Sequence, residues 1–117
     1  MNNQLGKIGE DLATNYLKKN KYKIIEKNFR IQNGEIDIIA IDKKTLVFIE
    51  VKTRSSTIFG TPFEAITPRK INFITRTAEY YKSTHNDLPE LLRIDAIAII
   101  INPQENTNII EHIENIN

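Results

Sequence analysis

The stretch "EIDIIAIDKKTLVFIEVKTR", residues 35–54, contains two runs of strand-forming residues separated by a pair of lysines. β-Branched residues dominate both runs, and such runs bounded by turn-forming residues are typical of β-strands. We expect strands at 35–42 and 45–54, with a third at 22–31 joined to them by the turn signal of residues 32–34. Because the connections are short, these three strands should form an antiparallel meander.

Two segments outside the meander have the apolar spacing of an amphipathic helix. Residues 4–19 show it before the first strand, and residues 69–83 show it after the third. The core positions expected in the first helix are Leu5, Ile8, Leu12 and Tyr16. Those expected in the second helix are Ile71, Ile74, Ala78 and Tyr81. Residues 55–68 show no periodicity and are expected to form a loop.

The C-terminal part of the chain supplies two more strands. The nearly continuous apolar run at 93–101 predicts a strand that is buried on both faces, and residues 107–114 predict a last edge strand. The resulting order is α-β-β-β-α-β-β. It predicts an α/β fold with a central mixed β-sheet flanked by helices.

The composition is that of one ordinary globular domain, covering residues 1–117. The absence of cysteine excludes a disulfide framework and a thiolate metal site, and it favours a cytoplasmic location. No apolar run approaches the roughly 20 residues of a membrane-spanning helix, so we expect no membrane partner. Since the net charge is only +1, any nucleic-acid-binding surface must come from a local cluster of basic residues.

Glu50 and Lys52 lie at the end of the third strand, on a face that is apolar upstream. Residues two apart on a strand share a face, so the carboxylate and the ammonium point the same way. On the preceding strand Asp37 interrupts an apolar run, and antiparallel pairing can bring it opposite or diagonal to Glu50. Two carboxylates this close repel each other unless a cation lies between them or one is protonated.

Asp37, Glu50 and Lys52 are together sufficient for metal-assisted hydrolysis of a phosphodiester. The two carboxylates could bind Mg²⁺ or Mn²⁺, which prefer carboxylate, water and phosphate oxygens. Lys52 could hold or deprotonate the attacking water and offset the charge of the transition state. The alternative for Glu50 and Lys52 alone, an exposed salt bridge worth about 0–1 kcal/mol, is the commoner one, and Asp37 brings the two interpretations level.

An ordered set of sequence blocks runs along nearly the whole chain. The blocks are "GEDLATNYL" (9–17), "NFR" (28–30), "GEIDIIA" (34–40), "FIEVKTR" (48–54), "FGTP" (59–62), Lys70 and "RID" (93–95). This set resembles the YraN family of bacterial proteins, within the PD-(D/E)xK nuclease superfamily. The resemblance implies a restriction-endonuclease-like fold, related to that of archaeal Holliday-junction resolvases.

The same resemblance implies roles for individual residues. Asp37 and Glu50 would be the metal ligands, Lys52 the catalytic lysine, and Glu10 an acid that faces the same site. The sequence departs from the family pattern at two places. Ile36 stands where the superfamily signature has proline, and Ile71 follows Lys70 where relatives often carry glutamine.

Several basic side chains could form the local cationic surface that the net charge conceals. Arg54 follows Lys52 on the same strand face, which favours a contact with substrate phosphate near the metal. Arg69 and Arg76 could follow a nucleic-acid backbone, although a solvated helix face explains them equally well. The candidate nucleic-acid-binding residues are Arg30, Arg54, Arg69, Lys70 and Arg76.

Other polar residues have ordinary structural explanations. The helix dipole alone favours an acid such as Glu10 in the first turns of a helix, by about 0.3–1 kcal/mol. Glu35 is expected to point to the face opposite Asp37. Arg93 and Asp95 share a strand face, and an ion pair explains them about as well as function does. The isolated histidines disfavour zinc, and no glycine-rich phosphate loop is present.

The leading hypothesis is a nucleic-acid-binding, divalent-metal-dependent endonuclease that hydrolyses DNA, with branched DNA as the substrate that the resemblance implies. The first alternative is a binding module of the same fold with little or no turnover. The second is a structural or interaction domain whose charged strand ends are ordinary surface. Symmetric resolution of a four-way junction would require a homodimer.

Overall fold

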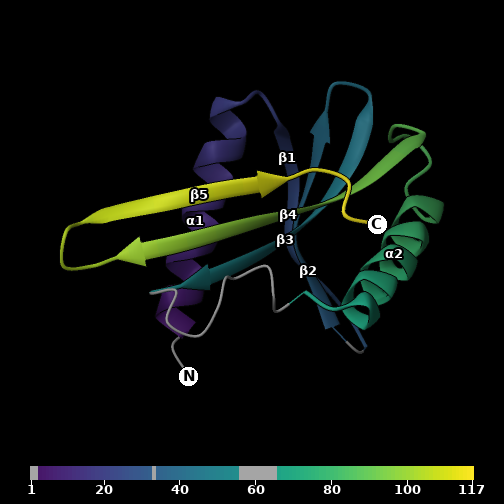
Figure 1. The fold of residues 1–117 in the computed structure, drawn as a ribbon. Helices are drawn as coiled ribbons and strands as arrows, with labels where there is room; N and C mark the ends of the chain where they lie inside the picture. The colour runs from purple at the N-terminus through teal and green to yellow at the C-terminus, as the bar shows by residue number, and fades with distance from the viewer. Residues whose placement is uncertain (1–2, 33, 56–65) are drawn as a thin grey trace.

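The computed structural model describes residues 3–32, 34–55 and 66–117. Two helices and five strands follow in the predicted order α-β-β-β-α-β-β (Figure 1). The element bounds agree with the predicted ones to within two residues. They are α1 (Asn3–Lys19), β1 (Lys23–Ile31), β2 (Gly34–Asp42), β3 (Thr45–Arg54), α2 (Pro68–Ser83), β4 (Leu91–Asn102) and β5 (Thr107–Ile113). The block "FGTP" lies outside the described residues.

The five strands form one mixed sheet in the order β1-β2-β3-β4-β5. The pairs β1–β2, β2–β3 and β4–β5 are antiparallel, which confirms the meander and the edge position of the last strand. β3 and β4 are parallel, and a parallel pair needs a crossover connection, which α2 supplies. This α/β arrangement is the restriction-endonuclease-like order that the sequence predicts.

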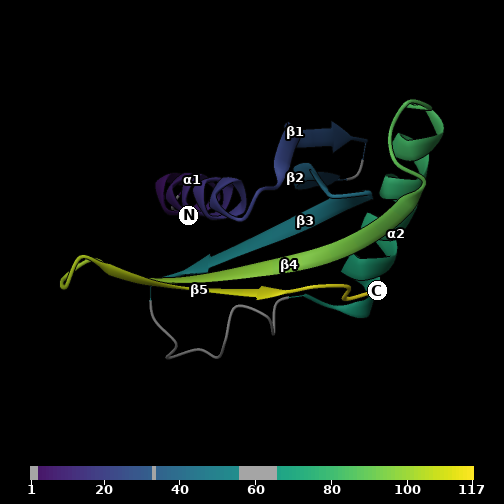
Figure 2. The same ribbon diagram turned by 90° about the horizontal axis from the view of Figure 1, so that it is seen from above.

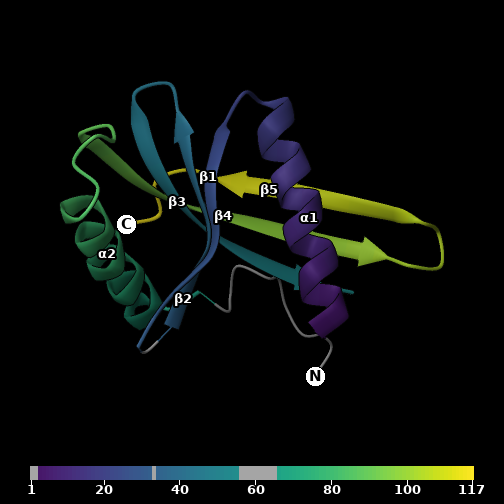
Figure 3. The ribbon, with the colours of Figure 1, turned by 180° about the vertical axis from the view of Figure 1, so that it is seen from behind.

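The two helices cover opposite faces of the sheet. One core cluster contains Ala13 and Leu17 of α1, and the other contains Ile74, Ala78 and Tyr81 of α2. Figure 1 shows α1 behind β4 and β5, and Figure 3, seen from behind, shows it in front of them. The helices are also displaced along the strands. Seen from above in Figure 2, α1 lies beside β1, and α2 lies beside the ends at which β3 and β4 begin.

The predicted core stripe of α1 is only partly confirmed: Leu12 and Tyr16 are partly buried against the core, but the completely buried residues lie about one position further along. Ile8 is 45% exposed, whereas Gly9 is buried and both Ala13 and Leu17 are completely buried. Gly9 permits this rotation, because a Cβ at that position would overlap the side chain of Thr53 on β3. Periodicity alone could not choose between the two stripes, since the close approach at Gly9 depends on the strand beneath it. The result brings Glu10, next to Gly9, to the edge of the sheet.

The remaining core predictions are largely confirmed. Ile74, Ala78 and Tyr81 of α2 are buried, and Ile71 is partly buried. Ile94–Ile99 of β4 are buried on both faces, as the continuous apolar run predicts. Within the described residues, neither helix is both long enough and apolar enough to cross a bilayer.

Candidate active site

The sheet opens at Asp37, in the first half of β2. The ladder between β2 and β3 ends at the pair Ile38–Ile49, after which β3 continues to pair with β4 alone. Asp37 Oδ2 accepts a hydrogen bond from the backbone N–H of Val51 at 2.7 Å. The Asp37 side chain therefore pairs with a backbone N–H of β3 that lies beyond the last pair of the ladder. A carboxylate is thus held between two separating strands, where its remaining oxygen lone pairs are available to a ligand.

Three carboxylates meet at this opening. One oxygen each from Glu10 on α1 and from Glu35 and Asp37 on β2 can be chosen so that all lie within 4.8 Å of one another. The implied approach of Glu10 to the strand acid is therefore present in the structure. The prediction that Glu35 points away from Asp37 is wrong. Residues two apart on a strand share a face, so strand alternation was the signal that could have found Glu35.

Asn28 on β1 connects two of these acids. Its Nδ2 donates to Glu10 Oε1 at 3.0 Å and Oε2 at 3.2 Å, and to Glu35 Oε2 at 3.2 Å. The Asn28 backbone has φ of 55°, in the left-handed region that asparagine tolerates better than most residues. This conformation interrupts the β1–β2 ladder between the pairs Lys27–Ile38 and Phe29–Ile36. Asn28 belongs to the block "NFR", and nothing in the sequence pattern marked it as a residue of the site.

Glu50 is buried, with only 3% of its surface exposed, and two lysines compensate its charge. Lys52 Nζ lies 3.3 Å from Glu50 Oε2, and Lys70 Nζ lies 3.2 Å from the same oxygen. Lys52 comes from the same strand and Lys70 from α2. The predicted Glu50–Lys52 pair is therefore present and is not an exposed salt bridge. Lys70, predicted only as a phosphate contact, shares this carboxylate.

The surroundings of Asp37 disfavour the ionised form of its carboxyl. Burial and then the nearby Glu50 raise the pKa of its carboxyl to about 8, with smaller contributions from Glu10 and Glu35. The hydrogen bond from Val51 opposes this rise but does not cancel it. A carboxyl in such surroundings either keeps its proton or gains a cation.

The donors at this site fit a hard divalent cation. Glu10, Glu35 and Asp37 offer only carboxylate oxygens, and Mg²⁺ and Mn²⁺ favour such ligands together with water. A cation would also relieve the repulsion that keeps the pKa of Asp37 high. In the described part of the chain this is the one group of three or more acids and histidines close enough to share an ion. Joint coordination by Asp37 and Glu50 stays a prediction.

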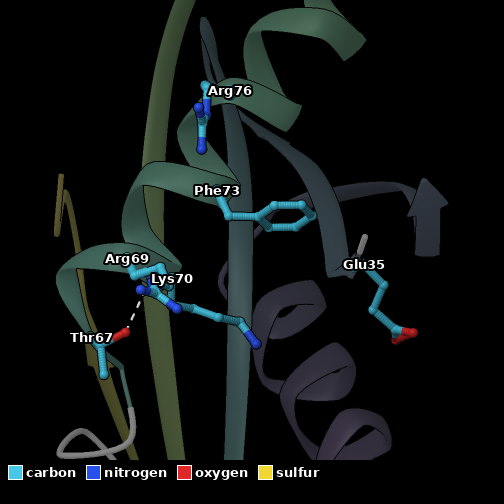
Figure 4. A pocket seen from close by; sticks show the side chains of 7 residues that line it. Glu35, Thr67, Arg69, Lys70, Phe73 and Arg76 are labelled. Carbon is cyan, nitrogen blue, oxygen red and sulfur yellow. Dashed lines mark hydrogen bonds between the residues drawn. The ribbon is translucent and has the colours of Figure 1, made fainter. Parts of the chain in front are cut away.

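The candidate basic residues flank the acids in two places. Arg69, Lys70 and Arg76 line a hollow of about 420 Å³ together with Gly34, Glu35, Thr67 and Phe73 (Figure 4). Arg54 lines a second hollow, of about 370 Å³, whose wall includes Glu10. Arg30 is exposed, and its Nε lies 3.0 Å from Glu35 Oε1. Since Glu10 and Glu35 meet at the acid cluster, cations lie on both sides of it.

Arg93 and Asp95 form an ion pair away from this site, with Arg93 Nε 2.9 Å from Asp95 Oδ1. The buried Asp95 also accepts from the Asn115 N–H at 3.0 Å and lies 2.7 Å from His112 Nε2. Tyr16 of α1 reaches the other ring nitrogen of His112. The structural interpretation thus accounts for these residues, because they connect α1, β4, β5 and the C-terminal segment.

The element order and the five-stranded mixed sheet define an α/β protein with the restriction-endonuclease-like fold. The model of the uncharacterised protein family UPF0102 matches residues 9–99, and the chain belongs to this family, which confirms the resemblance to YraN proteins. A UPF0102 protein of Clostridium botulinum (strain Kyoto / Type A2) is 48% identical, over 97% of this chain and 94% of its own. Another, of Syntrophomonas wolfei, is 45% identical over 98% of both chains.

Proposed function

We propose that this protein is a divalent-metal-dependent endonuclease that hydrolyses phosphodiester bonds in DNA. The observation that carries the proposal is the position of Asp37. It lies in a cluster with Glu10 and Glu35 and close enough to Glu50 to raise its own pKa, and Glu50 in turn holds Lys52. The site thus combines acids that can hold a cation with a lysine ammonium group that can face a phosphate.

Each side chain has a defined task in this proposal. Asp37, Glu10 and Glu35 would hold the cation, which polarises a phosphodiester oxygen and acidifies a water molecule when bound. The buried Glu50 orients the ammonium of Lys52 through the contact of 3.3 Å. Lys52 then offsets the negative charge that builds up on the phosphate during attack and donates a hydrogen bond to the attacking water. Lys70, on the same carboxylate, contributes to the same positive field.

The flanking cations give the substrate its path. Arg54 lies on the α1 side of the acid cluster, and Arg69 and Arg76 lie on the α2 side. A strand of DNA that contacts both groups passes over the carboxylates. Phosphate contacts of this kind position the substrate and do not read its sequence, so we propose recognition by DNA structure and, following the family resemblance, branched DNA as a substrate.

The test is cleavage of a labelled four-way junction and of a linear duplex in Mg²⁺ or Mn²⁺. We expect the wild type to cleave and Asp37→Asn, Glu50→Gln and Lys52→Met each to lose at least about 100-fold in rate, because each removes a charged group acting on the reacting phosphate. Asp11→Asn is the matched control, since Asp11 is an exposed acid of α1 whose ion pairs, among the described residues, are with the exposed Lys7 and Lys27. Equal cleavage by all five proteins would contradict the proposal.

A second candidate function is DNA binding without turnover. The observation that favours it is the pairing of Glu50 with two lysines. A carboxylate that already contacts two ammonium groups is less available as a ligand for a metal ion. In that case the wild type binds junction DNA with a steep dependence on salt and leaves it intact with every divalent ion tested.

A further inference from the structure

We infer that the hollow beside α2 binds one unpaired nucleotide of DNA, with its base against Phe73 and its phosphates against Arg69 and Arg76. This inference rests on the proposed function, because it adds a substrate class to the same site. The hollow is formed by the first half of α2 and the beginning of β2 (Figure 4).

The size of the hollow suits a single nucleotide. Its volume of about 420 Å³ lies within the roughly 300–1,000 Å³ of small-ligand pockets. A base inside a duplex is stacked and paired, so it cannot enter a pocket of this size unless it leaves the stack. An unpaired nucleotide, as in a single strand, a flap or the centre of a junction, enters without that cost.

Phe73 provides an aromatic surface within the hollow. Figure 4 shows its ring projecting from α2 across the hollow, between Arg76 and Lys70 and toward Glu35. The edge of the ring lies against Gly34, where a Cβ would overlap two of the ring carbons. The ring is therefore held by β2 and is only partly buried. Aromatic side chains in a positively charged groove are the surfaces on which proteins stack the bases of single strands.

The charges on the walls determine how a nucleotide lies. Arg69 and Arg76 are exposed, and neither has a carboxylate partner in the described part of the chain. Glu35, on the opposite wall, is already paired with Arg30, whereas Arg69 and Arg76 on α2 have no such partner among the described residues. The phosphates are therefore expected along α2, with the base against Phe73.

The hollow also lies next to the proposed reaction centre. Lys70 lines it and contacts Glu50 at 3.2 Å, while Glu35 lines it and belongs to the acid cluster. An unpaired nucleotide held here has its neighbouring phosphodiester at the acids. The inferred substrate is therefore DNA with unpaired nucleotides adjacent to the bond that is cut.

The experiment measures binding in EDTA by fluorescence anisotropy, with a labelled single-stranded oligonucleotide and a blunt duplex of the same length. Phe73→Leu keeps an apolar side chain of similar size on the core and removes the aromatic face. We expect it to weaken single-strand binding about tenfold and to change duplex binding less than twofold. Tyr80→Leu is the matched control, because Tyr80 is an aromatic residue of α2 that is 57% exposed and lies outside the hollow; it should change neither. Equal effects of Phe73→Leu on both DNAs, or no effect, would overturn the inference.

A second variant protects the test against misfolding of Phe73→Leu. Arg69→Gln with Arg76→Gln changes only exposed side chains. It should lower the slope of log K against log[salt] for the single strand by about 1.4, since each phosphate contact to a single strand contributes about 0.7. An unchanged slope would also overturn the inference.

The outcome is separable from that of the nuclease proposal, because hydrolysis does not occur in EDTA. A protein that cleaves nothing but loses single-strand binding in Phe73→Leu supports the nucleotide site and contradicts the nuclease. A protein that cleaves through Asp37 but binds both DNAs equally well with and without Phe73 supports the nuclease and contradicts the nucleotide site.

Discussion

The Asp37 carboxylate accepts the backbone N–H of Val51 at 2.7 Å and thereby joins β2 to β3 just beyond the last pair of their ladder. The bond holds the acid at the opening of the sheet. It also gives the partly buried amide of Val51 a partner where the two strands separate. A buried amide without a partner would cost about 1–3 kcal/mol. The sheet itself therefore positions Asp37 within the candidate site.

Asp37→Asn should stabilise the protein against unfolding, and more so as the pH rises. The pKa of Asp37 is raised from 3.8 to about 8 by burial first and Glu50 second. Between those values the unfolded state binds fewer protons than the folded state, so the stability of the wild type falls by at most about 1.4 kcal/mol per pH unit. Asparagine has no such dependence. Thermal melts in EDTA should show a difference in Tm near zero at pH 4 that grows toward pH 8; a constant difference would contradict this prediction.

Removing both lysines from Glu50 should destabilise the fold more than removing either one. Lys52→Met or Lys70→Met leaves one ammonium on the carboxylate, whereas the double variant leaves a buried charge alone, at a cost of about 3–5 kcal/mol. Urea unfolding measures these free energies. Adding Glu50→Gln to the double variant is the control, and it should recover most of the loss. If the double variant is as stable as the singles, Glu50 does not depend on these partners.

Asn28→Gly and Asn28→Ala should separate the backbone role of Asn28 from its side-chain role. Both variants lose the amide that donates to Glu10 and Glu35, and we expect Mn²⁺ affinity to fall about tenfold in each, as for other residues that orient metal ligands. The left-handed φ of 55° costs alanine free energy but costs glycine almost none. The Asn28→Ala protein should therefore be about 1 kcal/mol less stable than the Asn28→Gly protein. Calorimetric titration with Mn²⁺ and urea unfolding measure the two effects. Equal Mn²⁺ affinity in the wild type and both variants would show that the Asn28 side chain does not position the metal ligands.

Glu35→Gln should weaken Mn²⁺ binding to an extent similar to Glu10→Gln. Both acids lie within 4.8 Å of each other and of Asp37, so each removal takes one carboxylate from the same ion. Asp11→Asn, in the same helix as Glu10, should leave the affinity unchanged. A Glu35→Gln protein that binds Mn²⁺ as the wild type does would restrict the metal site to the remaining acids.

The amino-acid sequence determined the elements and most of the core, because alternation and helical spacing are local properties of the chain. Local sequence also indicated that Asp37, Glu50 and Lys52 lie together, because a two-residue turn leaves little freedom in how β2 and β3 pair. Alternation could also have placed Glu35 beside Asp37.

Only the tertiary structure decided the partners of these residues. The rotation of α1 that brings Glu10 to Asp37 depends on the contact between Gly9 and Thr53, which are far apart in the chain. Lys70 reaches Glu50 from α2, the helix of the crossover between β3 and β4. Asn28, itself in the left-handed conformation within β1, reaches both glutamates. Such contacts arise from how packed elements approach one another, and local spacing carries no record of that approach.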